Sequence, residues 1–426
     1  MKASDLFEEN TGQFLNLLIR EGGKTLADAV SELREAVDFC RYYAQQAIHD
    51  FGEPKRLPGP TGEVNTLGLR GRGVFACISP WNFPLAIFTG QVTAALASGN
   101  AVIAKPASQT PLVAALAIDL LHQAGVPQDV LHFLPGKASV LGDALVSDPR
   151  ISGVVFTGST STAQNINQHL ANRPGAIVPL IAETGGLNAM IVDSSALPEQ
   201  VVDSVIISSF QSAGQRCSAL RLLYLQEDIY DKVMPMLTAA MQELKVGNPQ
   251  KLDSDLGPVI DPQAAQEIED YIASHKDKLI ARGKVPHGLE GSYLAPAILE
   301  ISGIETLEKE VFGPVLHVAK FKAKDLDKVL DAINKKGYGL TMGVMSRVGS
   351  TIEHIRARAH VGNLYINRSM IGAVVGVQPF GGEGLSGTGP KAGGPFYLHR
   401  FAVERTFTDN ITAMGGNHEL LTMGEG

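Results

Sequence analysis

Two short segments contain the residue types that a thiol-based enzyme needs. Cys217 lies in the polar segment FQSAGQRCSALR (residues 210–221), where Gly214 gives the backbone room to approach a substrate. Glu183 follows an apolar run and precedes Gly185. A thiolate is a strong nucleophile, and a carboxylate near it can activate water as a general base. The two residues therefore suggest one active site, although a chance loop cysteine and a glutamate that only anchors the structure are the alternatives.

The composition excludes several classes of protein. A chain of 426 residues is long enough for two domains, and 44% hydrophobic with 19% charged residues is typical of a soluble globular protein. The net charge of −8 argues against a nucleic-acid partner. Three cysteines without paired spacing predict neither a disulfide framework nor a metal site. Acidic residues near the N-terminus and the lack of a long apolar run argue against a signal peptide and a membrane span, so a cytoplasmic protein is expected.

Apolar spacing predicts two successive α/β domains. Helices are expected at 4–20 and 25–48, and an exposed hairpin at 63–72. Buried strands then alternate with helices, which is typical of a parallel sheet; the strands are expected at 74–78, 101–104, 131–134, 153–156 and 177–182. A second series has strands at 189–192, 222–225, 315–319, 341–345 and 362–366, with helices at 227–243, 262–277, 324–334 and 350–359. The boundary falls near 185–188, so Glu183 and Cys217 are expected to face one cleft from opposite sides.

The dinucleotide fingerprint G-x-G-x-x-G is absent after every expected strand. The segment FTGSTSTAQNI offers another phosphate site, because Gly158 and Ser159 precede a helix that begins near Thr160 and whose free amides suit a pyrophosphate. An ordinary serine helix cap is the alternative. Lys105 ends a buried strand, where a lysine is unusual unless its ammonium group has a partner.

Seven motifs lie in order along nearly the whole chain. They are SPWNFP (79–84), KPASQTP (105–111), FTGS (156–159), AETGG (182–186), FQSAGQRCSA (210–219), EVFGP (310–314) and PFGGEGLSG (379–387). Together they resemble the signatures of the aldehyde dehydrogenase superfamily. The resemblance implies a Rossmann-like NAD(P)-binding domain (1–52 and 72–185) and a second α/β catalytic domain (186–395). A small β oligomerisation arm with the C-terminal tail (53–71 and 396–426) would pair with a neighbouring subunit in a homodimer or larger homo-oligomer.

The resemblance also implies a role for each site residue. Cys217 would attack an aldehyde, Asn82 and the Cys217 N–H would stabilise the oxyanion, and Glu183 would activate water. NAD would be held by residues from both domains: Ser79, Pro80, Trp81, Lys105, Ser108, Gly158, Ser159, Gly185, Glu310 and Phe312. Lys105 would bind the adenosine ribose and Glu310 the nicotinamide ribose. NAD-preferring relatives often have a glutamate where Ser108 stands, so the sequence leaves NADP open as well.

Substrate selection is expected to involve an anion site. Ser218 follows the nucleophile, and the N–H groups of the glycine-rich loop 385–395 can form a nest for a carboxylate. Ser386 and Gly387 are the expected contacts in that loop. With AETGGLNAMIV, QSAGQRCSALR and AGGPFYLHR, these features resemble the Δ1-pyrroline-5-carboxylate dehydrogenase branch, and more narrowly the dehydrogenase portion of bifunctional bacterial proline-catabolic proteins.

This branch implies oxidation of L-glutamate γ-semialdehyde to L-glutamate with NAD. The chain opens inside what resembles the early helical region of the family, and the flavin-binding proline dehydrogenase portion is absent from it. Three alternatives stay open. They are an aldehyde dehydrogenase for another aldehyde, a thiol hydrolase, and a non-catalytic scaffold of the same fold.

Overall fold

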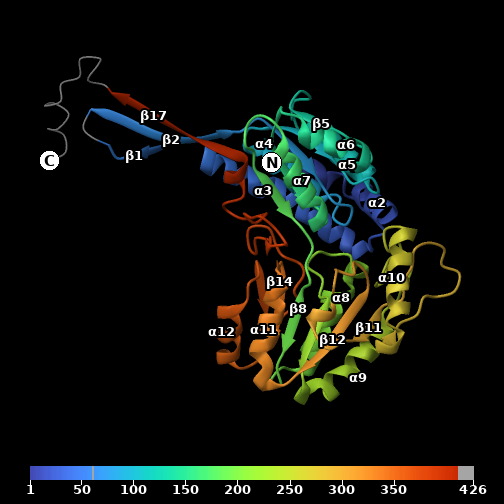
Figure 1. Cartoon of the computed structure of the whole chain (residues 1–426). Helices are drawn as coiled ribbons and strands as arrows, with labels where there is room; N and C mark the ends of the chain where they lie inside the picture. The colour runs from blue at the N-terminus through green and yellow to red at the C-terminus, as the bar shows by residue number, and fades with distance from the viewer. Residues whose placement is uncertain (60–61, 411–426) are drawn as a thin grey trace.

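The structure, a computed structural model, describes residues 1–59 and 62–410, and it has two lobes and a projecting arm (Figure 1). The expected tail at 411–426 lies outside the described residues. The first lobe is built on a parallel five-stranded sheet with the order β5-β4-β3-β6-β7. Its strands are β3 Val74–Ile78, β4 Ala101–Lys105, β5 Leu131–Phe133, β6 Ile151–Thr157 and β7 Leu180–Glu183. Parallel strands are covered on both faces, which is why these segments are almost continuously apolar.

Helices from two parts of the chain cover this sheet. The N-terminal helices are α1 Lys2–Glu9, α2 Thr11–Gly22 and α3 Leu26–Phe51, and the crossover helices are α4 Ala86–Ala97, α5 Pro111–Gln123, α6 Ala138–Ser147 and α7 Thr160–Asn172. One core joins α1 through α5 to β3 and β4. Thr25 begins α3 by accepting a hydrogen bond from the Asp28 N–H at 3.3 Å, and proline occupies the first turn of α5, where its missing N–H costs nothing.

Three expectations for this half of the chain were wrong in detail. The helix predicted at 4–20 is two helices, because Asn10 and Thr11 turn their side chains onto the carbonyls of Leu6 and Glu8 and compete with the helical ladder. The strand predicted from residue 177 begins only at Leu180, and Ile177 is fully exposed.

The hairpin predicted at 63–72 is instead one long strand, β2 Glu63–Gly71. It pairs antiparallel with β1 Lys55–Leu57 on one side and with β17 Ala402–Asn410 on the other. These three strands form the arm, which projects from the two lobes in Figure 1. The C-terminal strand of the described residues thus returns to the start of the first sheet.

The second lobe contains a seven-stranded sheet with the order β10-β11-β12-β9-β8-β14-β15. Its strands are β8 Ala189–Val192, β9 Leu222–Gln226, β10 Leu279–Arg282, β11 Ala297–Glu300, β12 Val315–Phe321, β14 Thr341–Met345 and β15 Asn363–Ile366. All pairs are parallel except β10 with β11. The helices are α8 Pro198–Phe210, α9 Glu227–Glu243, α10 Pro262–Ser274, α11 Leu326–Lys335 and α12 Gly349–Arg358.

The five strands predicted for this lobe are present, whereas β10 and β11 were not predicted. A small pair, β13 Tyr338–Gly339 with β16 Glu383–Gly384, lies beside the sheet. No helix among the described residues is long and apolar enough to cross a membrane.

Candidate active site

A cavity of about 430 Å³ contains both Cys217 and Glu183. Its walls come from α3, from the segment that starts α4, from the ends of β6 and β7, from the loop before β9 and from residues 372–375. The two residues lie on segments that precede and follow the boundary between the sheets. The expectation that they share one cleft agrees with this placement.

Cys217 is half-buried in the turn between α8 and β9. The backbone carbonyl of Cys217 accepts a 2.6 Å hydrogen bond from the side-chain amide of Asn188, which fixes the turn. Burial, together with the carboxylates of Glu310 and Glu183, raises the pKa of the thiol to about 12, although the charge of Arg221 opposes the rise. The thiol is therefore protonated until its electrostatic surroundings change.

Glu183 ends β7 with its carboxyl group in the cavity wall. Oε2 accepts a 3.0 Å hydrogen bond from the Gly382 N–H, while Oε1 is buried without any partner among the described residues. Burial raises the pKa of Glu183 to about 8, although the Gly382 N–H and the charge of Lys391 oppose the rise. A carboxyl with a pKa near neutrality and one free oxygen suits a general base.

The glycine-rich loop near residue 385 packs around Glu183 rather than lining the cavity. Gly387 pairs with Glu183 as an antiparallel bridge, and a Cβ at Gly387 would lie 3.0 Å from the carboxylate. Ser386 is fully buried, donates to the Gly185 carbonyl at 2.8 Å and accepts from the Gly339 N–H at 3.1 Å. Both residues are therefore placed to support the base, and neither borders the space that was expected to hold a substrate carboxylate.

Ser218 does line the cavity, and its neighbours there were not predicted. The N–H groups of Gly372 and Ala373 face no acceptor among the described residues, and both residues border the cavity. Opposite polar side chains come from α3: Arg34 and the half-buried Glu35. Burial and the charge of Glu32 raise the pKa of Glu35 to about 7. In the sequence these residues form the polar face of an amphipathic helix, which ordinarily faces solvent.

Asn82 lies behind the nucleophile loop. Its side-chain amide donates to the Gln215 carbonyl at 3.1 Å, two residues before Cys217. The backbone N–H of Cys217 has no acceptor among the described residues. The Asn82 amide thus contacts the backbone of the nucleophile loop, and it would have to leave Gln215 to serve as an oxyanion donor.

The first lobe holds the expected adenosine and phosphate residues at strand ends. Lys105 is 3% exposed, and its ammonium group donates to the Pro106 carbonyl at 3.1 Å. The Ser79 hydroxyl on the adjacent strand end is buried without a partner among the described residues. Ser108 is exposed, and Ser159 caps α7 by accepting from the Thr162 N–H at 3.2 Å. The cap alternative for Ser159 is therefore realised, while the amides of the first turn of α7 still point away from the helix.

The second lobe supplies the expected nicotinamide residues. The Phe312 ring meets the Trp81 ring edge-on at 5.5 Å, and Trp81 belongs to the same turn as Pro80. Glu310 is bound to the guanidinium of Arg221 at 2.9 Å. A Cβ at Gly185 would lie 2.1 Å from Glu310 Oε2, so only glycine lets this carboxylate reach the end of β7. Gly158, at the end of β6, donates its N–H to the Glu183 carbonyl at 3.1 Å.

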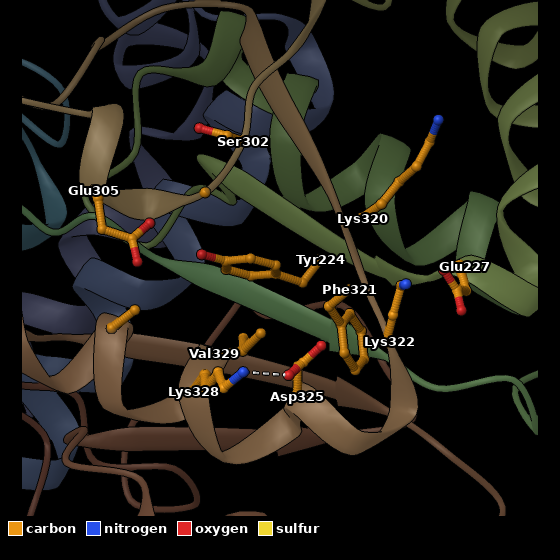
Figure 2. A pocket seen from close by; sticks show the side chains of 12 residues that line it. Tyr224, Glu227, Ser302, Glu305, Lys320, Phe321, Lys322, Asp325, Lys328 and Val329 are labelled. Carbon is orange, nitrogen blue, oxygen red and sulfur yellow. Dashed lines mark hydrogen bonds and ion pairs between the residues drawn. The ribbon is translucent and has the colours of Figure 1, made fainter.

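A second hollow, of about 330 Å³, lies between β9, β12 and α11 (Figure 2). Its charges are mixed, and Lys328 pairs with Asp325 at 2.7 Å. The Tyr224 hydroxyl accepts from the Ile304 N–H. None of the expected site residues borders this hollow. Across residues 1–59 and 62–410, no cluster of three or more His, Cys, Asp or Glu side chains could hold a metal ion.

Comparison with known proteins finds one family over most of the chain. The model of the aldehyde dehydrogenase family matches residues 1–407. The bifunctional protein PutA of Klebsiella aerogenes is 50% identical over 419 residues, which are 95% of this chain and only 31% of that protein. The 1-pyrroline-5-carboxylate dehydrogenase of Bacillus mycoides is 39% identical over 420 residues, covering 96% of this chain and 80% of that one. The crystal structure of a Thermus 1-pyrroline-5-carboxylate dehydrogenase with bound NAD matches with a TM-score of 0.91 and 37% identity, over 96% of this chain and 80% of that one.

Proposed function

Because the chain belongs to the aldehyde dehydrogenase family, we propose that it oxidises L-glutamate γ-semialdehyde, the open form of Δ1-pyrroline-5-carboxylate, to L-glutamate with NAD+. The observation that carries the proposal is one cavity that contains a thiol, Cys217, and a carboxylate with a free oxygen, Glu183. The names of the relatives support the choice of substrate. Since the chain spans 31% of the PutA relative, the proposal concerns aldehyde oxidation alone.

In the first half of the reaction, Cys217 acts as a thiolate on the aldehyde carbon and forms a thiohemiacetal. The oxyanion that develops needs fixed donors, and removing one such donor costs about 10²–10³ in rate. The free Cys217 N–H and the Asn82 amide, released from Gln215, would supply them. A bound NAD+ would supply the acceptor for the hydride that leaves this carbon. The acyl group then remains on the sulfur as a thioester.

In the second half, Glu183 takes a proton from water as the water attacks the thioester. The product carboxylate leaves, and Cys217 is regenerated. The Gly382 N–H holds Oε2 of the carboxyl group, and the bridge to Gly387 holds the Glu183 main chain. Oε1 is buried without a hydrogen-bond partner among the described residues, so it would have to turn towards the cavity to meet the water. A pKa near 8 makes Glu183 a stronger base than an ordinary carboxylate at the same degree of ionisation.

The residues of the cofactor site fit a dinucleotide. Lys105 is a buried ammonium with a single carbonyl partner, and the Ser79 hydroxyl beside it is unpartnered among the described residues. The first turn of α7 offers amides to a pyrophosphate. Glu310 and the aromatic pair Trp81–Phe312 would hold the nicotinamide half. Ser108 presents no negative charge that would repel a 2′-phosphate, so NADP is expected to bind as well.

The substrate differs from a simple aldehyde by its α-carboxylate and α-ammonium groups. The free amides of Gly372 and Ala373 and the hydroxyl of Ser218 would bind the carboxylate, in place of the loop at 385–395. Glu35 would face the ammonium group, and pairing would favour its ionised form. An uncharged aldehyde of the same length would use none of these contacts.

The arm is proposed to pair with a second copy of the chain. β17 is exposed along most of its length, and its outer edge has no strand partner among the described residues. An unpaired edge presents a row of N–H and C=O groups with which a strand of another chain can pair. The assembly would therefore be a homodimer or a larger homo-oligomer.

The direct test is NADH formation by the purified protein with L-glutamate γ-semialdehyde, compared with an uncharged aldehyde of the same length. We expect turnover that prefers the charged substrate and is lost in Cys217→Ala. Cys40→Ala is the matched control, because Cys40 is buried in the core away from the cavity. Turnover of the uncharged aldehyde alone would discard the substrate and keep the mechanism. NAD binding without any turnover would favour the scaffold, and ester hydrolysis without NAD would favour the thiol hydrolase.

A further inference from the structure

Arg221 is the largest fully buried side chain of the described residues, and the mechanism above does not use it. It stands at the end of the nucleophile loop, directly before β9. Its guanidinium is 1% exposed and has four hydrogen bonds to protein atoms. A buried guanidinium with this many fixed partners holds those partners in place.

On one side, Arg221 binds the carboxylate that is expected to receive the cofactor ribose. Nε and Nη2 both donate to Glu310 Oε1, at 3.1 Å and 2.9 Å. The guanidinium carbon also lies 5.1 Å from the centre of the Phe312 ring. Arg221 therefore contacts both second-lobe residues of the proposed nicotinamide site.

On the other side, Arg221 binds the backbone that leads into the nucleophile. Nη1 donates to the Gly214 carbonyl at 2.7 Å, and Nη2 donates to the Arg216 carbonyl at 3.0 Å. This backbone is strained, because Ser212 and Ala213 have φ values of 55° and 52°. The residue after Arg216 is Cys217, so the same guanidinium limits where the thiol can lie.

The main chain of Arg221 is itself held in place. Its N–H donates to the Asn188 carbonyl at 2.9 Å. Its carbonyl accepts from the His317 N–H at 3.0 Å, and His317 Nδ1 lies 2.9 Å from it. Burial lowers the pKa of His317 to about 4, so no second positive charge competes with the guanidinium at neutral pH. Among these partners, only Glu310 is a side chain that a ligand can engage.

We propose that Arg221 is a positioning residue that couples the cofactor site to the nucleophile through Glu310. The inference rests on the proposed function, because Glu310 must meet the cofactor. Glu310 and Arg221 act on the thiol in opposite directions, the carboxylate disfavouring the thiolate and the guanidinium favouring it. When a ribose hydroxyl donates a hydrogen bond to Glu310, the carboxylate neutralises less of the positive charge of Arg221. The thiolate of Cys217 then becomes easier to form.

The experiment measures the pH profile of Cys217 alkylation by iodoacetamide, with and without NAD and in the absence of aldehyde. The midpoint of the profile reports the pKa of the Cys217 thiol. If NAD only shields the thiol from iodoacetamide, the alkylation rate at the plateau falls but the midpoint does not move. Binding of NAD is followed separately through Trp81, the single tryptophan of the chain. Cys217→Ala gives the blank for the other cysteines. In the natural sequence we expect NAD to lower the midpoint by about one pH unit, a tenfold gain in thiolate below it.

Two variants test the coupling from opposite ends. Arg221→Lys keeps a charge but cannot bind Glu310 and both carbonyls at once. Glu310→Gln leaves the guanidinium and its two backbone bonds in place. In both variants we expect NAD to quench the fluorescence of Trp81, which shows that NAD binds. In neither do we expect NAD to shift the midpoint of the alkylation profile. Arg282→Lys, at the more exposed pair with Glu269, is the matched control and should keep the shift.

The outcomes separate this inference from the function it rests on. A midpoint that still shifts in Glu310→Gln, or in a folded Arg221→Lys, overturns the coupling. A natural sequence that binds NAD without a shift overturns it too and leaves the proposed function intact. Failure of NAD to quench Trp81 in the natural sequence overturns both. If Arg221→Lys does not fold, Glu310→Gln alone decides. If the role of Arg221 is purely structural, the Glu310→Gln variant should keep the NAD-dependent shift of the midpoint.

Discussion

At the scale of single residues, the pKa of the general base has a direct kinetic consequence. Glu183 is active only when ionised, and burial raises its pKa to about 8. Turnover limited by thioester hydrolysis should therefore rise with pH up to about 8 and level off above it. Glu183→Gln should lower the hydrolysis rate by about 10²–10⁴-fold, the usual contribution of a general base.

A stopped-flow experiment checks this prediction. In Glu183→Gln, one equivalent of NADH per active site should form in a burst, followed by slow turnover, because the thioester accumulates. Lys391→Met is a second variant, since the charge of Lys391 opposes the rise of the Glu183 pKa. Its pH profile should move to higher pH. A profile that keeps its midpoint in Glu183→Gln would assign the pH dependence to another group.

The same ionisation also affects stability. The pKa of Glu183 is raised on folding, so the folded state prefers the protonated carboxyl, and stability declines as pH rises towards the folded pKa of about 8. Glu183→Gln removes this dependence. Its advantage over the natural sequence in urea unfolding should therefore grow between pH 6 and pH 9 on the order of a few kcal/mol.

Gly185 lies where the proposed cofactor site has no room for a side chain. A Cβ there would lie 2.1 Å from Glu310 Oε2, so Gly185→Ala must displace the carboxylate. We expect the dissociation constant for NAD to rise about tenfold, or about 1.4 kcal/mol. Titration of Trp81 fluorescence measures it. Gly349→Ala is the control, because a Cβ at Gly349 meets nothing within 4 Å, and an unchanged dissociation constant in Gly185→Ala would refute the argument.

At the scale of elements, α3 supports the nucleophile loop from the other lobe. Asp28, in its first turn, is 2% exposed and pairs with Arg216 at 2.9 Å. Burial alone would raise the pKa of Asp28, but Arg216 and Lys24 lower it. The pair thus stabilises the fold above the ordinary carboxylate pKa, and this contribution is lost as pH falls through the lowered value.

Asp28→Asn should therefore cost about 3–5 kcal/mol in urea unfolding at pH 7, because it leaves the Arg216 charge buried without its partner. It should also slow acylation, since Arg216 precedes Cys217. The control is Asp148→Asn, which breaks a pair with Arg150 whose arginine is 84% exposed, and little change is expected there. Equal stability of the two variants at pH 7 would mean that Asp28 does not act through Arg216.

The sequence predicted elements better than it predicted contacts between them. Strand ends such as Glu183 and Lys105 could be found because buried runs stop at a polar residue. The sequence predicts that the glycine-rich loop at 385–395 binds the substrate, because a glycine indicates close backbone approach but not to which group. For Gly387 the structure gives a different group, the Glu183 carboxylate. Gly372 and Ala373 lie in an apolar segment without any signal, and Glu35 looks like any solvent-facing helix residue until α3 is packed beside the cavity.

At the scale of the whole molecule, the ordered motifs were enough to predict the family, and the alternation of apolar runs predicted the two sheets. The pairing of β2 with β17 could not be predicted, since the strands are separated by most of the chain and register depends on their contact. This pairing places the last strand of the described chain beside β2, which directly precedes the first sheet. The arm packs little against the lobes, as its exposed strand β17 and Figure 1 show.

The arm therefore makes a prediction about assembly. Phe407, on β17, is 56% exposed, so its ring is available to pack against a second copy of the arm. Phe407→Asp should weaken self-association by about 1–3 kcal/mol per interface, the contribution of burying such a side chain. Sedimentation velocity over a range of concentrations measures the effect. Thr406→Asp, at the neighbouring position on the opposite face of the strand, separates loss of the ring from added charge. A protein that sediments as a monomer at all concentrations would refute arm pairing without touching the chemistry of Cys217, since neither residue borders the cavity.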